Sequence, residues 1–152
     1  MTRRHTGLVA LTHDHHHALG HARRLRLAAN GDSQGLLRQA QRFLAFFHEE
    51  TLNHFREEEE VVFPLAVQDE RATQLLGQVM MEHLKIHALA SQLSAQVSRG
   101  SITSEVATAL AAALEAHIRF EEGKLFPLIE EVVGDEQLSG LSLPRDRIPV
   151  PG

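Results

Sequence analysis

Apolar residues recur at spacings of three and four along most of this chain, and short turn-like clusters interrupt the pattern three times. This spacing is typical of helices that bury one face. Gly31, Gly100 and Gly134 stand where the pattern breaks, as expected of residues that end helices. Four helices joined by short turns predict an all-α protein, an up-down-up-down four-helix bundle. The predicted helices cover about residues 8–29, 35–67, 72–99 and 104–133.

The length of the chain, 152 residues, fits one domain with a single core. We expect residues 1–136 to form the bundle. Residues 137–152 hold three of the five prolines and show no helical periodicity. They are therefore predicted to form an irregular C-terminal tail, which can lie across the bundle, and the sequence assigns no chemistry to it.

Composition narrows the class of protein. The net charge of −5 and the lack of a long Lys/Arg block argue against nucleic acid as a partner. No apolar stretch approaches the roughly 20 residues of a membrane span, and no signal peptide is evident, so we expect no membrane partner and a cytoplasmic location. Because the chain has no cysteine, any metal must be held by nitrogen and oxygen atoms. The unusual count is that of histidine, with 11 residues.

An internal repeat relates the second predicted helix to the fourth. Residues 54–64 align without gaps on residues 117–127, with matches at His, Arg, two Glu, Phe and Pro. A weaker repeat relates the first helix to the third, where Asp14-His15 aligns with Glu82-His83. The chain therefore resembles a duplicated helix pair, and a bundle of two such pairs is pseudo-twofold. This symmetry suits a site of two metals.

The repeated segment contains a His followed four residues later by a Glu. Residues at i and i+4 lie on the same face of a helix, so this spacing can aim a nitrogen and an oxygen at one point. The pairs are His54 with Glu58 and His117 with Glu121, and both lie on apolar faces.

The apolar faces of the first and third helices also carry histidines. His15 lies at the centre of one, and His83 lies on the other with His87 one turn later. A single inward His is more often a core residue bonded to a carbonyl, and a single His/Glu pair is more often on the surface. Together, however, these groups fall at similar heights in the bundle, where burial would cost several kcal/mol each without a compensating cation. The sequence therefore predicts a metal centre.

The number and type of candidate ligands favour two irons. Five histidines and two carboxylates exceed the needs of one tetrahedral zinc, although zinc or manganese stays possible. No helix carries the ExxH motif of ferritin-like di-iron proteins, and His48-Glu49 lacks the second His of a zinc protease.

These motifs resemble those of the hemerythrin family, specifically its bacterial HHE cation-binding branch, over about residues 8–133. The resemblance rests on the opening of residues 12–19, on the two HxxxE segments that end in Phe-Pro, and on Glu82-His83. It implies a centre of two irons of the Fe-O-Fe type, with both glutamates bridging. Glu121 follows His117 at i+4, as in the bacterial branch, whereas oxygen carriers have an Asp at i+5. The implied ligands are His15, His54, Glu58, His83, His87, His117 and Glu121.

Other polar residues near these motifs are predicted to lie mostly in solvent. His16 could be a spare ligand or a group that supports one, and Glu50, one turn before His54, could orient its imidazole. The residues expected in solvent are His13, His17, His21, Glu57, Glu59, Glu60 and Glu122.

Three functions remain compatible with the sequence. The leading hypothesis is a non-haem di-iron protein that binds or senses O₂ or NO, or that handles iron. The second is a di-iron redox enzyme with peroxide or NO chemistry or a role in iron-centre repair. The third is a metal-stabilised interaction module. Whether the protein is an enzyme, and whether it forms oligomers, is left open.

Overall fold

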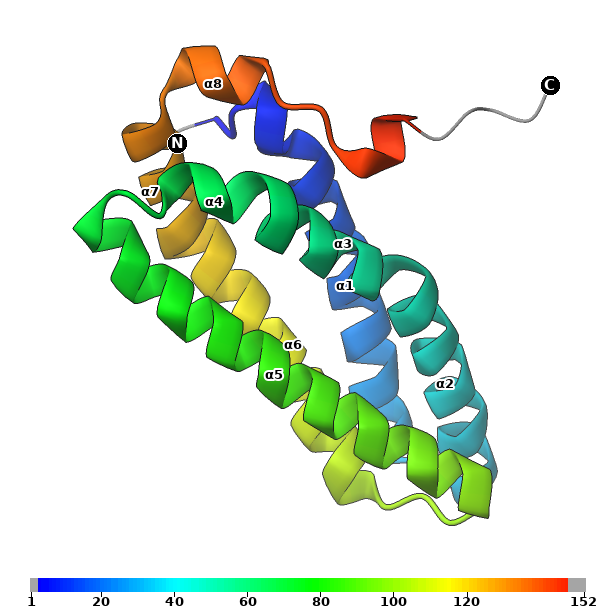
Figure 1. The fold of residues 1–152 in the computed structure, drawn as a ribbon. Helices are drawn as coiled ribbons and strands as arrows, with labels where there is room; N and C mark the ends of the chain where they lie inside the picture. Colours follow the sequence, from blue (N-terminus) through cyan, green and yellow to red (C-terminus); the bar gives the residue numbers. More distant parts are fainter. Residues whose placement is uncertain (1–2, 148–152) are drawn as a thin grey trace, which may run out of the picture.

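The protein is all-α, as predicted, and its long helices form a bundle in the computed structural model, which describes residues 3–147 (Figure 1). Two of the four long helices are built from several consecutive segments that continue without a break. In chain order, the first long helix is η1 (Thr6–Leu8) with α1 (Val9–Ala28), and the second is α2 (Ser33–Phe46), η2 (Phe47–Thr51), α3 (Leu52–Glu57), η3 (Glu58–Val62) and α4 (Phe63–Ala66). The third is α5 (Glu70–Arg99), and the fourth is α6 (Ser104–Phe120), η4 (Glu121–Leu125) and α7 (Phe126–Val133).

The helix ends follow local chemistry that the sequence shows. The Asp32 carboxylate accepts a hydrogen bond from the Gly35 amide at 2.7 Å and so caps α2, and Asp69 caps α5 in the same way. Gly100 ends α5 with a φ of 68°, a left-handed conformation that glycine adopts without strain. The observed ends agree with the predicted ones to within about two residues.

The four long helices surround one interior. In the bundle, α1 packs on α2 and α6, and α5 packs on α2 and α6 (Figure 1). Successive long helices run antiparallel, which confirms the predicted up-down-up-down arrangement. No helix within residues 3–147 has the length and apolar character needed to cross a membrane.

Three five-residue π-helical segments interrupt the second and fourth long helices. In η3 the Phe63 amide donates to the Glu58 carbonyl, and in η4 the Phe126 amide donates to the Glu121 carbonyl. Proline follows in each case, and its ring disfavours ordinary α-helical bonding to the carbonyl four residues earlier. The repeated Phe-Pro therefore accompanies a widened turn that begins at a glutamate, and such turns are common at functional sites.

The interior has two apolar clusters with a polar layer between them. Residues on one side of this layer belong to the cluster near the Gly31 and Gly100 turns, and those on the other side belong to the cluster near the two termini. The change occurs within single helices: Leu11 and Ala18 lie in different clusters, on either side of His15. The polar layer consists of His15, His54, Glu58, His83, His117 and Glu121, all buried.

The C-terminal segment crosses the end of the bundle near the N-terminus (Figure 1). It contains α8 (Asp135–Ser139) and the 3-10 turn η5 (Pro144–Arg147). Leu138 and Leu143 are buried against the bundle. A Cβ atom at Gly7 would lie 2.2 Å from the Leu138 carbonyl oxygen, so the two ends of the chain are closely packed. Residues 148–152 of the predicted tail lie outside the described residues.

Candidate metal centre

The polar layer contains two groups of potential ligand atoms that share both glutamates. Group A is His15, His54, Glu58 and Glu121, and group B is Glu58, His83, His117 and Glu121. Within each group the atoms lie within 4.8 Å of one another. The side chains come from α1, α3, η3, α5, α6 and η4, so every long helix contributes.

Glu58 faces both groups with different oxygen atoms. Its Oε2 lies 3.3 Å from the Nε2 of His54 in group A, and its Oε1 lies 3.4 Å from the Nε2 of His83 in group B. Glu121 Oε1 lies 3.7 Å from the Nε2 of His15 and contacts the Nε2 of His117. Both carboxylates are therefore placed between the two groups, as bridging ligands would be.

A cation fits this arrangement. The Nε2 atoms of the four histidines and all four glutamate oxygens are buried, and none has a hydrogen-bond partner among the described residues. Buried polar atoms without partners are costly, and imidazole nitrogen with carboxylate oxygen is a donor set that transition-metal ions accept. Metal ligation would satisfy all eight atoms.

Each of the four histidines forms a hydrogen bond through Nδ1, the ring nitrogen that faces away from the centre, to a carboxylate other than Glu58 and Glu121. The distances from Nδ1 to a carboxylate oxygen are 2.7 Å for His15 and 2.8 Å for the other three. Because a carboxylate accepts, each Nδ1 carries a proton, and in the neutral ring that can bind a metal each Nε2 keeps its lone pair towards the centre. The pairs are His15 with Glu122, His54 with Asp14, His83 with Glu59, and His117 with Glu82.

These supporting carboxylates connect neighbouring helices in a closed ring. Asp14 on α1 holds a histidine of α3, Glu59 on η3 holds one of α5, Glu82 on α5 holds one of α6, and Glu122 on η4 holds one of α1. Each supporting acid directly precedes or follows a residue of group A or B. Every long helix thus contributes to the centre and also orients an imidazole of its neighbour.

Comparison with known proteins agrees with this geometry. The hemerythrin HHE cation-binding domain matches residues 6–129, most of the chain. The chain belongs to this family. It is therefore a metal-ion-binding domain, and the buried His/Glu groups fit the ion. No significant match was found among curated proteins or among solved structures.

The HHE domain brings together six of the seven predicted ligands. His87 is the exception, because it lies outside groups A and B and its side chain is exposed. Its ring lies edge-on to Phe47 and Phe55, with centroids 5.9 and 5.6 Å away. The resemblance implied a metal beside His87, but the neighbours of its ring are these two phenylalanines.

The sequence did not predict which acids support the histidines of the HHE domain. Glu59 and Glu122 were expected in solvent, but they are half-buried and hold His83 and His15. Glu57 was also expected in solvent and is 3 % exposed. Glu50 does not orient His54, since its carboxylate instead lies 2.8 Å from the Nδ1 of His17.

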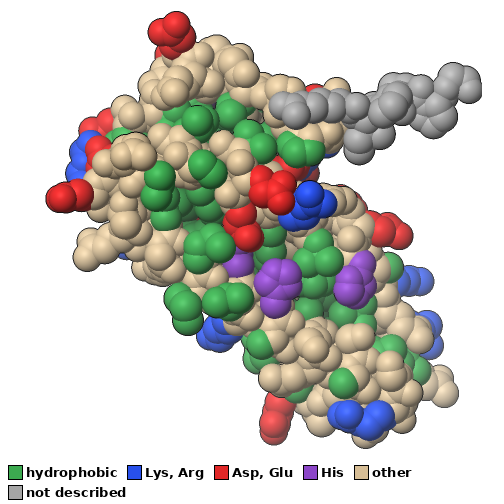
Figure 2. Space-filling view, in the orientation of Figure 1, with side chains coloured by type: hydrophobic (Ala, Val, Ile, Leu, Met, Phe, Trp, Pro, Cys, Tyr) green, Lys and Arg blue, Asp and Glu red, His purple; other side chains and the backbone are tan. Residues whose placement is uncertain are grey.

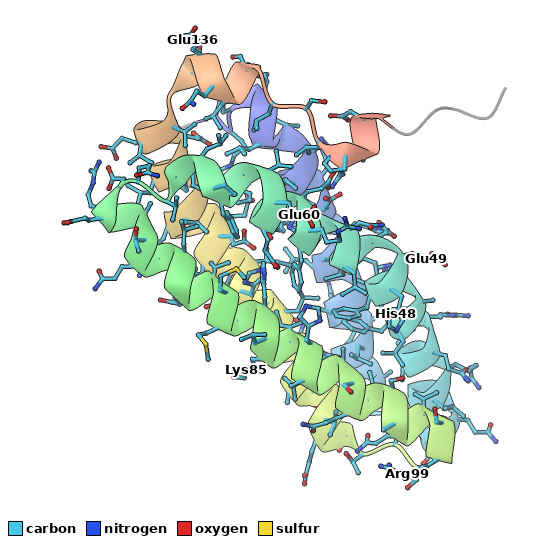
Figure 3. All side chains as sticks on the ribbon, viewed as in Figure 1. His48, Glu49, Glu60, Lys85, Arg99 and Glu136 are labelled. Atoms are coloured by element: carbon cyan, nitrogen blue, oxygen red, sulfur yellow. The ribbon has the colours of Figure 1, made fainter. Side chains whose placement is uncertain are left out.

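The remaining histidines of the opening motif lie away from the centre. His13, His16 and His17 are exposed, as was expected for His13 and His17, whereas His21 is half-buried and stacks on Phe46 at 4.1 Å. His48, which is labelled in Figure 3, is exposed on the second long helix. On the face drawn in Figure 2, other histidines reach the surface between apolar patches midway along the bundle.

Burial and crowding change the acidity of the ligands. Burial raises the pKa of Glu58 well above its ordinary value, and the nearby Glu121 charge raises it further. Burial alone would lower the pKa of His117, but the adjacent Glu121 outweighs it and raises that pKa to about 10. Burial and the nearby His117 lower the pKa of His83 to about 3. Without an ion, protons must balance the charges here, so metal binding releases protons.

Proposed function

We propose that this HHE domain holds two iron ions, one in each group, and binds a diatomic gas, O₂ or NO, beside them. Four imidazoles and two shared carboxylates supply a donor set that suits two irons and exceeds the needs of one tetrahedral zinc. Iron supplies the affinity for O₂ and NO when it is bound. The protein supplies fixed imidazoles, two shared carboxylates and apolar side chains around the cavity.

The observation that carries this proposal is a small cavity beside the ligands. It has a volume of about 20 Å³ and is bordered by His15, His54 and His117, which come from both groups. A space of this size admits one molecule as small as water. It is too small for an organic substrate, which favours a gas as the ligand.

The rest of the cavity wall is apolar except for Thr51 and the two acids at its outer side. Apolar side chains keep water out and leave few groups that can react with a bound gas. Asp14 and Glu50 also border the cavity and connect it to a larger surface hollow of about 410 Å³. The apolar lining consists of Ala18, Phe46, Phe55, Leu114 and Ile118.

Rapid mixing of the reduced, iron-loaded protein with O₂ and with NO tests the proposal. We expect a change in the optical spectrum with at least one gas, and no change in zinc-loaded protein, which cannot change oxidation state. The absence of any change in the iron-loaded protein would exclude gas binding. Continuous consumption of NO or peroxide would instead identify a redox enzyme.

We expect the bound gas to contact Thr51. It is buried, borders the cavity, and its hydroxyl has no hydrogen-bond partner among the described residues. Thr51→Val keeps the shape and removes the donor. If the hydroxyl donates to the bound gas, the loss of about 0.5–1.5 kcal/mol weakens binding roughly 2- to 12-fold.

Gas titration of Thr51→Val and of the parent protein measures this difference. Metal content is the internal control, because Thr51 belongs to neither group and the variant should load the same amount of iron. Equal gas affinity of the two proteins, at equal iron content, would show that Thr51 is only a wall of the cavity.

A further inference from the structure

Arg145, in the C-terminal turn η5, lies between two carboxylates of the bundle. Its Nη1 donates to Asp14 Oδ1 at 3.0 Å, and its Nε donates to both oxygens of Glu57 at 2.9 and 3.0 Å. Nη2 contacts both acids, and the Arg145 backbone amide lies 3.3 Å from Glu57. The guanidinium therefore joins α1 and α3 through the C-terminal segment.

One of these two acids supports a metal ligand. Asp14 presents Oδ2 to His54 Nδ1 at 2.8 Å. Burial alone would raise the pKa of Asp14, but hydrogen bonds from His54 and Arg145 outweigh it and hold that pKa at about 2. A continuous series of contacts thus runs from Glu57 through Arg145 and Asp14 to His54, whose Nε2 faces the centre.

The internal repeat shows that this series exists in only one half of the site. Glu57 aligns with Phe120 in the second copy, so the buried acid has an apolar counterpart. Asp14 aligns with Glu82, which accepts from the Gln78 amide at 3.1 Å and from His117. Among the side chains that the structure describes, which end at residue 146, no guanidinium reaches Glu82 or Glu59, the supporting acids of group B.

Group A, in contrast, meets an arginine at both of its supporting acids. Arg4 lies 3.4 Å from the carboxylate of Glu122, which holds His15, and also binds the Glu122 carbonyl at 2.8 Å. Both terminal segments of the chain therefore bring positive charge to the same half of the centre.

The burial of Glu57 explains why Arg145 has a fixed position. The Glu57 side chain is only 3 % exposed, and an unpaired carboxylate in such a place is costly. Arg145 is the partner that the structure gives it. Because Glu57 fixes the guanidinium, the guanidinium can in turn fix Asp14, which lies at the edge of the surface hollow.

We propose that Arg145 is a positioning residue that holds Asp14 against His54 and thereby makes metal retention in group A depend on the C-terminal segment. This inference rests on the proposed binding of two metals. The C-terminal segment would thus support the ligands of group A, whereas its described residues make no such contact with the equivalent acids of group B. Groups that orient metal-bound histidines typically contribute 10- to 100-fold to metal affinity.

The test measures how fast Fe(II) leaves the intact protein for an excess of a coloured chelator under argon. The comparison is between Glu57→Gln and Glu57→Gln/Arg145→Met, because the first change removes the buried charge that Arg145→Met alone would leave unpaired. We expect one of the two irons to leave the double variant at least about 10-fold faster than it leaves Glu57→Gln, while the release rate of the second iron stays the same.

A second pair of proteins shows whether Arg145 acts through Asp14. Adding Arg145→Met to Asp14→Asn/Glu57→Gln should change neither release rate, since the acid that Arg145 holds is already removed. Arg71→Met is the matched surface control, because Arg71 pairs with Asp69 and Glu131 away from the centre.

Two results would overturn the inference while leaving the proposed function intact. One is a release rate in Glu57→Gln/Arg145→Met that equals the rates in Glu57→Gln and in the parent protein. The other is faster loss of both irons together with a lower unfolding temperature of the metal-free double variant, which would indicate a general structural role. A parent protein that binds fewer than two irons would overturn the proposed function, and this inference with it.

Discussion

Removal of the metal is expected to lower the unfolding temperature of the protein by roughly 15–30 °C. An ion present at about 1,000 times its dissociation constant stabilises the folded state by about 4 kcal/mol, so two ions contribute about 8 kcal/mol. For a chain of this length each kcal/mol shifts the midpoint by about 2–4 °C. The physical reason is that eight buried polar atoms lose their partner when the metals leave.

Thermal unfolding with and without a chelator, followed by circular dichroism, measures this shift. Added metal should restore the original midpoint. The control is Glu58→Leu/Glu121→Leu, in which apolar side chains replace the buried carboxylates, and its midpoint should not respond to the chelator. A parent protein whose midpoint is also unaffected would show that metal does not contribute to folding stability.

The helices and the six central residues could be predicted because both depend on spacing within a single helix. Apolar periodicity gave the four long helices, and HxxxE placed His54 with Glu58 and His117 with Glu121. His87 shows the limit of this reasoning. It shares a helical face with His83, yet one turn further along α5 the neighbouring side chains are those of Phe47 and Phe55.

The supporting acids depend on which helix lies beside which. Glu59 and Glu122 are five residues after His54 and His117, so regular periodicity turns them about 140° away, towards an expected solvent face. In the bundle they reach the flank of the next helix and meet His83 and His15 there. The available signal was an acidic residue directly beside each ligand pair, combined with the cyclic order of the bundle.

Arg145 was beyond prediction for a related reason. Its segment has no periodicity that indicates a facing direction, and its partners Asp14 and Glu57 are 131 and 88 residues away. Glu57 carried a weak indication, because it replaces the phenylalanine of the other repeat copy. A buried acid at such a position requires a partner, but the sequence alone does not identify it.

Glu58→Gln is expected to weaken the binding of both metals, by more than about 100-fold each. The two carboxylate oxygens of Glu58 face different groups, Oε2 towards His54 and Oε1 towards His83. An amide keeps the size of the side chain but loses its charge and one of its oxygen donors. Because loss of a group that only orients a ligand costs 10- to 100-fold, loss of a bridging ligand should cost more.

His15→Ala and His87→Ala are the comparison variants that show whether the loss of both metals is specific to a shared carboxylate. His15 belongs to group A alone, so its removal should release one metal and leave the other, whereas His87 belongs to neither group and its removal should leave both. Metal content per chain after gel filtration distinguishes the three variants. If Glu58→Gln retained one metal as tightly as the parent, Glu58 would serve a single ion, and the two groups would not share it. The ordering of the three variants thus separates a bridged pair of metals from two independent sites, because only a shared carboxylate couples the loss of one ion to the loss of the other.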